Sequence, residues 1–364
     1  MAIFDVLMPV KDGMPYLLDA IAGIRRQTLT DWRMFIVDHG STDGSLEAAC
    51  RAAEADRRIV VVQCPAEHDF SRLLNDGLAR CDARYVLRQD ADDVSLPQRM
   101  QVLAAAFEDD PGVVLLGSQG HVIDGAGRRS GRFDMPLVPE RIAALSFFRI
   151  PVLHPAAAIR LDPFVRLGAR YGHDFIEAVP AAERLEVGGL AEDYFLFGQL
   201  ALVARCRNVK ERLLHFRWHD KNISSRKHAE QIRVAVTISR YLARTFAMLN
   251  DVPAFDPAPV CNHGYRLVDI RGRDRFDREF EAMRDSLSRG LCRSEALARE
   301  LAKELNFRRC LVHRHSAVMI ERYLLHAARH GIDRSEWYTV KSWLVHRAGI
   351  ARGLAGSPAL VAID

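Results

Sequence analysis

Two aspartates, Asp90 and Asp92, follow the short apolar run Tyr85–Leu87. Side chains two residues apart in an extended segment point the same way, so these carboxylates can share a hard cation. Mg²⁺ and Mn²⁺ prefer a few carboxylates plus phosphate oxygens to a full cage of protein ligands. The pattern alone is weak, because acids after a strand often only cap the next helix. We assign that capping role to Asp93, which precedes Ser95-Leu-Pro97.

A second polar cluster, residues 38–44, also follows an apolar run. Its Ser, Thr, Asp and Gly residues suit a tight turn and a helix cap, which leaves Asp38 itself unexplained. An acid at that position can accept hydrogen bonds from a nucleotide base or a ribose. Pro9 and Val10 end the first apolar run of the chain. Arg72, near a later helix, could reach a base or phosphate, and solvation at the surface explains it equally well.

A third acidic pair, Glu192 and Asp193, follows the glycine-containing stretch 187–190 and opens a helical pattern. Acids in a first helical turn suit the helix dipole. A carboxylate on a glycine-flanked loop is also a good general base. His219 directly follows the segment Val209–Trp218, which we predict to be a strand. There it could ligate a metal or contact a diphosphate, although a histidine at a strand end is more often structural.

The elements that must position these residues alternate between short apolar runs and helical patterns. This alternation predicts a parallel sheet with crossover helices. The polar clusters 9–13, 38–44 and 90–93 fall at the carboxyl ends of the strands, where ligands gather in such sheets. The predicted strands are Phe4–Met8, Phe35–Val37, Ile59–Val62, Tyr85–Leu87 and Val113–Leu116.

The later part of the chain changes character. We expect a hairpin at 121–128, a strand at 153–161, a helix at 192–204 and a strand at 209–218. From residue 227 to 364 the apolar residues recur at helical spacing. The predicted fold is therefore an α/β domain over residues 1–226, followed by an all-helical region.

The composition bounds the class of protein. With 364 residues, 49% apolar and 27% charged, the chain can form a large core and about two domains. Seven scattered cysteines without a Cys-x-x-Cys pair indicate reduced thiols, not a disulfide frame or zinc site. No apolar run reaches the roughly 18 residues of a membrane span, and the start lacks a signal-peptide pattern. We therefore expect a cytoplasmic protein.

The net charge of +4 is unevenly distributed. Residues 227–364 hold 23 Lys and Arg against 16 Asp and Glu. A basic region can meet an anionic membrane surface or an anionic acceptor, and interspersed charges also suit solvated helix faces. Three uses of the helical region stay open: a homodimer interface, a wall of the acceptor site, and contact with the inner membrane face. Basic and aromatic residues do not interleave, so we expect no nucleic-acid partner.

In order and spacing, residues 5–225 resemble the family 2 glycosyltransferases of the GT-A fold. Each matching piece is weak alone, and the series is specific. The pieces are Leu7-Met-Pro-Val10, Gln27-Thr-Leu-Thr-Asp31, Ile36-Val-Asp-His-Gly-Ser-Thr-Asp-Gly44, Asn75-Asp-Gly-Leu78, Asp90-Ala-Asp-Asp93, Gly117-Ser118, Ile123-Asp124, His154-Pro155, Glu192-Asp-Tyr194 and Phe216-Arg-Trp-His219.

The resemblance implies inverting, metal-dependent transfer of a hexose from a nucleotide-diphosphate sugar, with UDP the expected nucleotide. The acceptor would be a hydroxyl of a glycan or lipid-linked molecule in bacterial polysaccharide or glycoconjugate synthesis. The implied roles are a donor pocket of Pro9, Val10, Asp38, Arg72 and Asp90, a Mn²⁺ or Mg²⁺ site of Asp92 and His219, and Asp193 as catalytic base.

Two departures from the family pattern flank the nucleotide pocket. His39 replaces an aspartate, and Lys11-Asp12 replaces the usual Tyr-Asn. The reaction class is therefore better supported than the donor. Two alternative functions stay open. The first is a sugar-1-phosphate nucleotidyltransferase, which residues 8–13 do not favour because they lack a Gly-rich phosphate loop with arginine. The second is a non-catalytic sugar-nucleotide or glycan-binding scaffold, which the presence of Asp90, Asp92 and Asp193 does not favour.

Overall fold

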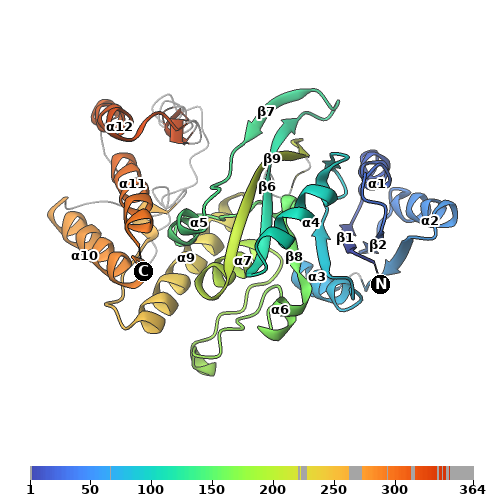
Figure 1. Ribbon diagram of the computed structural model, residues 1–364, viewed down its shortest axis with the longest axis horizontal. Coiled ribbons are helices and arrows are strands. Elements are labelled where there is room, and N and C mark those ends of the chain that lie inside the picture. The colour runs from blue at the N-terminus through green and yellow to red at the C-terminus, as the bar shows by residue number, and fades with distance from the viewer. Residues whose placement is uncertain are drawn as a thin grey trace. The chain divides into compact units, whose positions relative to one another are not determined.

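The computed structural model describes residues 2–65, 67–219, 222, 228–261, 273–292, 294–312, 316–333, 336–337, 339–341 and 344 (Figure 1). The chain divides into two compact units. The first unit comprises residues 1–139 and 150–226, and the second comprises 140–149 and 227–364. Residues 140–149 thus fold with the helical unit, although the sequence places them inside the α/β domain. The predicted helical region extends to residue 364, and its part beyond residue 344 lies outside the described residues.

The first unit contains one mixed sheet with the strand order β3-β2-β1-β4-β8-β6-β9-β5, and β7 pairs with β6. Strands β3, β2, β1 and β4 are mutually parallel, as are β6 and β9, whereas β5, β7 and β8 run antiparallel to their neighbours. The predicted strand and helix alternation is confirmed. The strands are β1 (Phe4–Val10), β2 (Trp32–Asp38), β3 (Ile59–Gln63), β4 (Tyr85–Arg88), β5 (Val94–Ser95), β6 (Val113–Ile123), β7 (Arg129–Phe133), β8 (Ala158–Arg160) and β9 (Arg205–Arg217).

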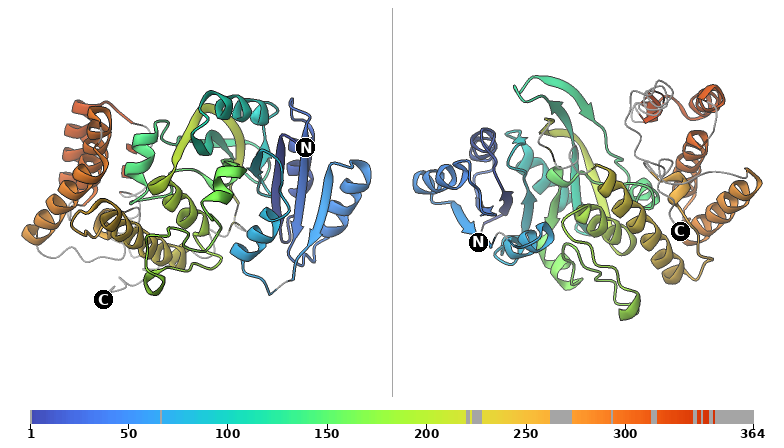
Figure 2. Two further views of the ribbon diagram at one scale, coloured as in Figure 1. Left: turned by 60° about the horizontal axis from the view of Figure 1, so that its bottom comes forward. Right: turned by 180° about the vertical axis from the view of Figure 1, so that it is seen from behind.

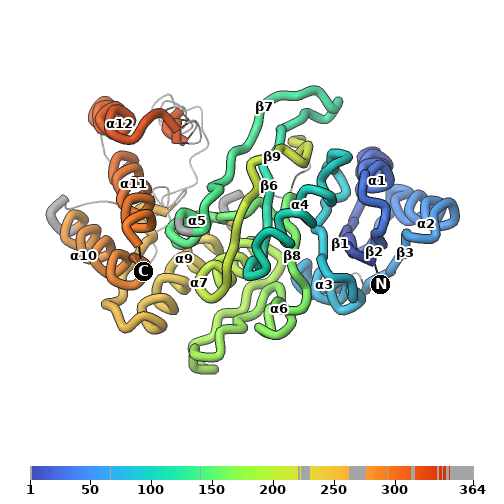
Figure 3. Tube along the Cα trace, viewed as in Figure 1, coloured from blue at the N-terminus to red at the C-terminus, as the bar shows by residue number. Residues whose placement is uncertain are grey.

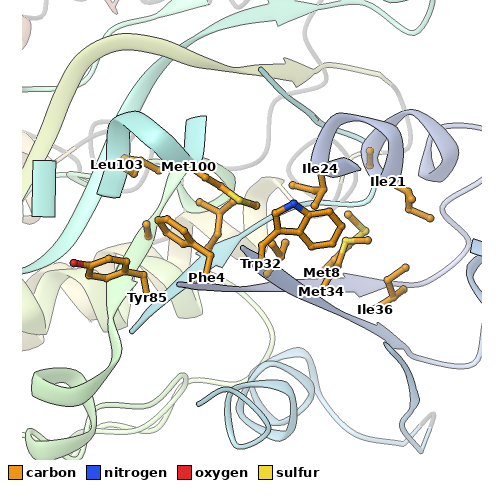
Figure 4. Close-up of a cluster of buried hydrophobic side chains, with 14 of the residues drawn as sticks. Phe4, Met8, Ile21, Ile24, Trp32, Met34, Ile36, Tyr85, Met100 and Leu103 are labelled. Atoms are coloured by element: carbon orange, nitrogen blue, oxygen red, sulfur yellow. The ribbon is translucent and has the colours of Figure 1, made fainter. Parts of the chain in front are cut away.

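Helices cover both faces of the parallel strands, which explains why these strands are continuous apolar runs. On one face, Phe4 and Met8 of β1 pack with α1 and α4 (Figure 4). On the other face, α3 approaches β1 closely at Gly77, where an added Cβ would lie 2.3 Å from Leu7 Cδ1. The helices of this unit are α1 (Leu17–Arg25), α2 (Ser45–Ala55), α3 (Phe70–Leu78), α4 (Arg99–Asp109), α6 (Leu161–Arg166) and α7 (Glu192–Val203).

Strand register brings the polar clusters to one edge of the sheet. Val10 at the end of β1 pairs with Asp38 at the end of β2, and Leu7 pairs with Arg88 at the end of β4. The short strand β5 then pairs antiparallel with β9, whose long run beside β6 is visible in both views of Figure 2. This pairing carries residues 90–93 to the end of β9.

Of two local predictions, the hairpin at 121–128 is confirmed and the strand at 153–161 is wrong in part. The hairpin is confirmed, because β6 and β7 pair across a turn closed by the Asp124 N–H donating to the Arg128 carbonyl at 2.9 Å. The strand predicted at 153–161 is wrong over its first half. Residues His154–Ala156 form a 3₁₀ turn, and only Ala158–Arg160 pair in the sheet. Pro155 has no N–H to donate to a ladder, which favours the turn.

The second unit is helical, as predicted. The described part of α9 buries Ile232, Leu242 and Phe246, and the Ser239 hydroxyl donates to the Phe147 carbonyl. No described helix is both long and apolar enough to cross a bilayer. The helices are α5 (Pro139–Leu145), α9 (His228–Asn250), α10 (Arg273–Leu291), α11 (Glu295–Leu311) and α12 (Ser316–His330), and the tube in Figure 3 follows the last three in orange and red.

Candidate active site

Three aspartates form a tight cluster after β4. One carboxylate oxygen from each of Asp90, Asp92 and Asp93 lies within 4.8 Å of the others. Asp93 is fully buried, and its Oδ1 accepts a hydrogen bond from the Arg217 N–H at 2.7 Å. The prediction that Asp93 caps a helix is therefore wrong, because the carboxylate fastens the loop to β9. Its Oδ2 has no hydrogen-bond partner within the described structure.

Asp92 faces His219 across the gap between the β4 loop and the end of β9. Its Oδ2 lies 3.0 Å from His219 Nε2 and accepts from Asn222 Nδ2 at 3.3 Å. Burial, and then the charge of Asp90, raise the pKa of Asp92 to about 6. Burial, and then the charges of Asp92 and Asp90, raise the pKa of Asp93 well above its usual range. Carboxylates crowded together, one with an unpartnered oxygen, fit a site for a divalent cation.

The loop after β1 supports His219. The Tyr16 ring stacks on the His219 imidazole with centroids 4.9 Å apart, and the Arg217 guanidinium carbon lies 4.5 Å from the centre of the Tyr16 ring. Arg217 also donates from Nε to the Asp92 carbonyl at 2.8 Å. Tyr16 and Arg217 were not predicted, because their roles depend on contacts between segments far apart in the sequence.

Asp38 is buried at the end of β2. Its Oδ2 accepts from the N–H groups of Gly40 (3.0 Å) and Ser41 (3.2 Å), and its Oδ1 has no partner among the described residues. The His39 N–H donates to the Val10 carbonyl at 2.9 Å, and His39 Nε2 is a buried atom that likewise lacks a partner there. This edge of the sheet therefore offers two unpartnered polar atoms beside Val10.

Hydrogen bonds connect the loop after β1 (residues 11–16) to the loop after β2 (residues 39–44). Asp12 adopts a positive φ of 53°, and its Oδ1 accepts from the Thr42 N–H at 2.7 Å. The Asp43 carboxylate accepts from the Met14 N–H at 2.8 Å. Asp43 Oδ1 also accepts from the Ser45 N–H at 3.0 Å, so this acid both joins the two loops and accepts from the first N–H of α2. Arg72, in contrast, has an exposed side chain on α3, and the described structure gives its guanidinium no ion pair.

Asp193 lies in the first turn of α7. The preceding Ala191 takes a left-handed conformation with φ of 55°, which costs a non-glycine residue energy and is typical of functional sites. The Asp193 Oδ1 accepts from the Tyr194 N–H at 2.7 Å. Burial raises the pKa of Asp193 to about 6. Burial, and then the charge of Asp193, raise the pKa of Glu192 to about 8.

A chain of buried side chains joins the two acidic sets. Arg88 Nη2 donates to Asp90 Oδ1 at 2.5 Å, and Arg88 Nε donates to His154 Nε2 at 3.1 Å. His154 Nδ1 lies 3.8 Å from Glu192 Oε1 and 4.0 Å from Asp193 Oδ2. Because an arginine N–H can only donate, His154 Nε2 is an acceptor, and the ring carries its proton on Nδ1. Burial, and then the charge of Arg88, lower the pKa of His154 well below its usual range, so the ring is neutral.

No role was predicted from the sequence for Arg88 or His154, the two residues in the middle of this series of contacts. Arg88 stands two residues before Asp90, and His154 was noticed only as part of a matching piece. A polar residue at the last position of a buried strand was the one available signal.

Comparison with known proteins identifies the chain. The profile described as "Glycosyl transferase family 2" matches residues 5–165. Residues 5–165 form a family 2 glycosyltransferase domain. One relative is the O-antigen biosynthesis protein RfbC of Myxococcus xanthus, 30% identical over 40% of this chain and 12% of its own length. Another is the amylovoran biosynthesis glycosyltransferase AmsE of Erwinia amylovora, 27% identical over 48% of this chain and 66% of its own length.

The fold of this glycosyltransferase is the predicted one. The structure of S. aureus TarS 1–349 in complex with UDP-GlcNAc matches with a TM-score of 0.51 and 17% identity, covering 92% of this chain and 93% of that one. The GT-A fold with a C-terminal helical region is thereby confirmed. The matches to RfbC and AmsE span only 12% and 66% of those proteins, so their products do not define this enzyme's substrate.

Proposed function

We propose that this glycosyltransferase moves a hexose from a nucleotide-diphosphate sugar to a hydroxyl of a glycan or lipid-linked acceptor, with inversion at the anomeric carbon. The observation that carries the proposal is the link from Asp90 through Arg88 and His154 to Asp193. This link supports a single site in which the aspartate cluster would hold a cation and Asp193 would act as general base. The names of RfbC and AmsE support synthesis of a bacterial polysaccharide, and the UDP-GlcNAc in TarS supports a UDP-linked donor.

The donor nucleotide would lie at the ends of β1 and β2. Pro9 and Val10 form one wall, and the unpartnered Oδ1 of Asp38 would accept an N–H of a uracil-like base. Asp90 would lie against the ribose and sugar. Arg72, exposed on α3, is proposed to contact the nucleotide from outside this wall.

Asp92 and His219 would hold Mn²⁺ or Mg²⁺. A bound divalent cation supplies positive charge against the negative charge that grows on the leaving diphosphate. Arg217, the last residue of β9, holds the Asp92 backbone in place, and Tyr16, in the loop after β1, holds the His219 ring.

Asp193 would take the proton of the acceptor hydroxyl while that oxygen attacks the anomeric carbon and the bond to the diphosphate breaks. One displacement needs one base and no enzyme nucleophile, unlike the two-carboxylate hydrolase scheme. Glu192, with its raised pKa, stays protonated at neutral pH and adds no second charge. A positioned general base contributes about 10²–10⁴-fold in rate.

A donor panel tests the proposal. The enzyme is incubated with UDP- and GDP-linked hexoses and candidate glycan acceptors, with Mn²⁺ or with EDTA, while release of nucleotide diphosphate is measured. We expect release that requires the acceptor and the metal. Pyrophosphate release from a nucleoside triphosphate and a sugar-1-phosphate would favour the nucleotidyltransferase rival. Donor binding without turnover across a broad acceptor panel would favour the scaffold rival.

A further inference from the structure

The helical unit contains a basic cavity of about 290 Å³ between α11 and α12, two helices that pack against each other (Figure 1). Arg309 contributes from α11, and Arg322, His326, Arg329 and His330 contribute from α12. The α12 residues have the spacing i, i+4, i+7 and i+8, which puts them on one face of the helix. None of these residues has a role in the proposed transfer reaction.

The charges in this cavity are only partly neutralised. Arg309 donates to Asp277 at 2.8 Å and to Glu281 at 3.0 Å, so its charge is balanced. Arg322 and Arg329 have no acidic partner within the described part of the chain. Two guanidinium groups facing one cavity without counter-charge favour an anionic ligand, and their planar donor pairs match phosphate oxygens.

Two ring nitrogens in the same wall have no hydrogen-bond partner among the residues that the structure describes. His326 is only 5% exposed and lies with Nε2 at 3.1 Å from Glu336 Oε2. The Glu336 carboxylate therefore holds the proton on Nε2, and the buried Nδ1 has no partner among the described residues. His330 Nε2 is a buried atom in the same condition. Buried polar atoms are nearly always hydrogen-bonded, so unpartnered ones in a cavity wall point to a ligand.

An exposed apolar side chain lines the cavity. Leu325 is 66% exposed, and the residue before it in α12, Leu324, is 59% exposed outside the cavity lining. A cationic pocket beside exposed leucines suits a phosphate that carries an organic chain better than a bare ion.

We propose that this cavity binds a phosphate ester, with Arg322 and Arg329 donating to the phosphate oxygens and the unprotonated Nδ1 of His326 accepting from a hydroxyl of the ester. A lipid headgroup and a soluble phosphate ester share this chemistry. The site is independent of the proposed transfer reaction, because no residue of the candidate active site takes part in it.

The test compares the full-length enzyme, the double variant Arg322→Gln/Arg329→Gln and the control Arg299→Gln. Arg299 is an exposed arginine of α11 that pairs with Glu295 outside the cavity wall, so its substitution lowers the net charge without changing the cavity. Calorimetry with glycerol 3-phosphate measures binding of a soluble phosphate ester (the soluble arm of the test). Sedimentation with phosphatidylcholine vesicles, with and without phosphatidic acid, measures binding of a lipid headgroup (the lipid arm). Thermal melts establish that all variants are folded.

We expect the parent and the control to bind in at least one arm, and the double variant to bind at least tenfold more weakly there. Binding in the lipid arm alone identifies a headgroup site, and binding in the soluble arm identifies a free ester. No binding in either arm, or equal binding by the parent and the double variant, would overturn the proposal. The single variant Arg329→Gln, at an exposed position, replaces the double variant if that protein does not fold.

Discussion

Asp193 combines a buried position with access for a substrate, since 22% of its side chain is exposed. Asp193→Asn keeps the size and removes the base. We expect a loss of at least 10²-fold in turnover, because a general base contributes about 10²–10⁴-fold. Nucleotide binding, measured by calorimetry, should stay near the parent value. Full turnover by this variant would remove Asp193 from the mechanism, and Asp162→Asn, at an exposed acid of α6, serves as control.

The raised pKa of Asp193 predicts the pH dependence of the reaction. The base must be ionised, so activity should be constant above a pH of about 6 and fall about tenfold per unit below it. An aspartate with the ordinary pKa of about 3.9 would keep full activity down to pH 5. The measurement is kcat against pH with saturating donor and acceptor. A profile flat down to pH 5 would contradict a base of this pKa.

We predict that His154 is a positioning residue, because it would affect the reaction only through its interaction with Asp193. His154→Phe removes the Nδ1–H that faces the two acids and should raise the pKa of Asp193 further, since a dipole that favours the ionised carboxylate is lost. We expect roughly tenfold lower kcat, with the acid limb of the pH profile moved to higher pH.

The control for His154 is Tyr171→Phe, which removes the hydroxyl lying 2.9 Å from Nε2 and keeps Nδ1 in place. Its acid limb should not move. If His154→Phe lowered activity equally at every pH, His154 would be a structural residue only.

At the scale of elements, the approach of α3 to the sheet depends on Gly77. Its φ is ordinary, so the need for glycine is steric: a Cβ would lie 2.3 Å from Leu7 Cδ1 and 3.1 Å from Val37 Cγ2. Gly77→Ala should destabilise the protein by about 1–3 kcal/mol, the usual cost of overpacking a core. Urea unfolding measures the change.

Gly188→Ala is the matched control, since nothing lies within 4 Å of its Cβ position. That variant should unfold within about 0.5 kcal/mol of the parent, as surface substitutions usually do. Equal destabilisation of both variants would show that loss of glycine, and not a clash with β1, is responsible.

At the scale of the whole molecule, residues 140–149 tie the chain's two units together in sequence. Phe147 packs on Phe246 with ring centroids 5.1 Å apart, and the Arg308 guanidinium lies 4.9 Å from the centre of the Phe148 ring. Arg141 pairs with Asp333 at 3.2 Å. All these partners lie after residue 226.

A chain cut after Arg226 should therefore expose both phenylalanines, and each buried phenylalanine is worth about 1.5–3 kcal/mol. We expect the cut chain to bind a hydrophobic dye and to aggregate. Phe147→Ser/Phe148→Ser in the cut chain should reduce both effects. A cut chain that stays monomeric and binds no dye would show that residues 140–149 do not need the helical unit.

The sequence by itself determined the alternation of strands and helices, the helical end region and the acids at strand ends. These features follow from local periodicity and from residue types that recur at short spacing, and their order indicated the family. Phe4–Met8 and Tyr85–Leu87 were predicted as strands because both of their faces are buried, which makes them continuous apolar runs.

Only the tertiary structure decided which distant residues meet. The contact of Asp93 with Arg217, the Arg88–His154 link and the packing of Phe147 on Phe246 each join segments more than 50 residues apart in the sequence. No local period encodes such contacts, because they arise from strand order and register. The same reason explains why the strand predicted at 153–161 was wrong over its first half. The apolar stretch around Pro155 predicted a strand, whereas the tertiary structure has a turn there, and that turn brings His154 close to Glu192 and Asp193.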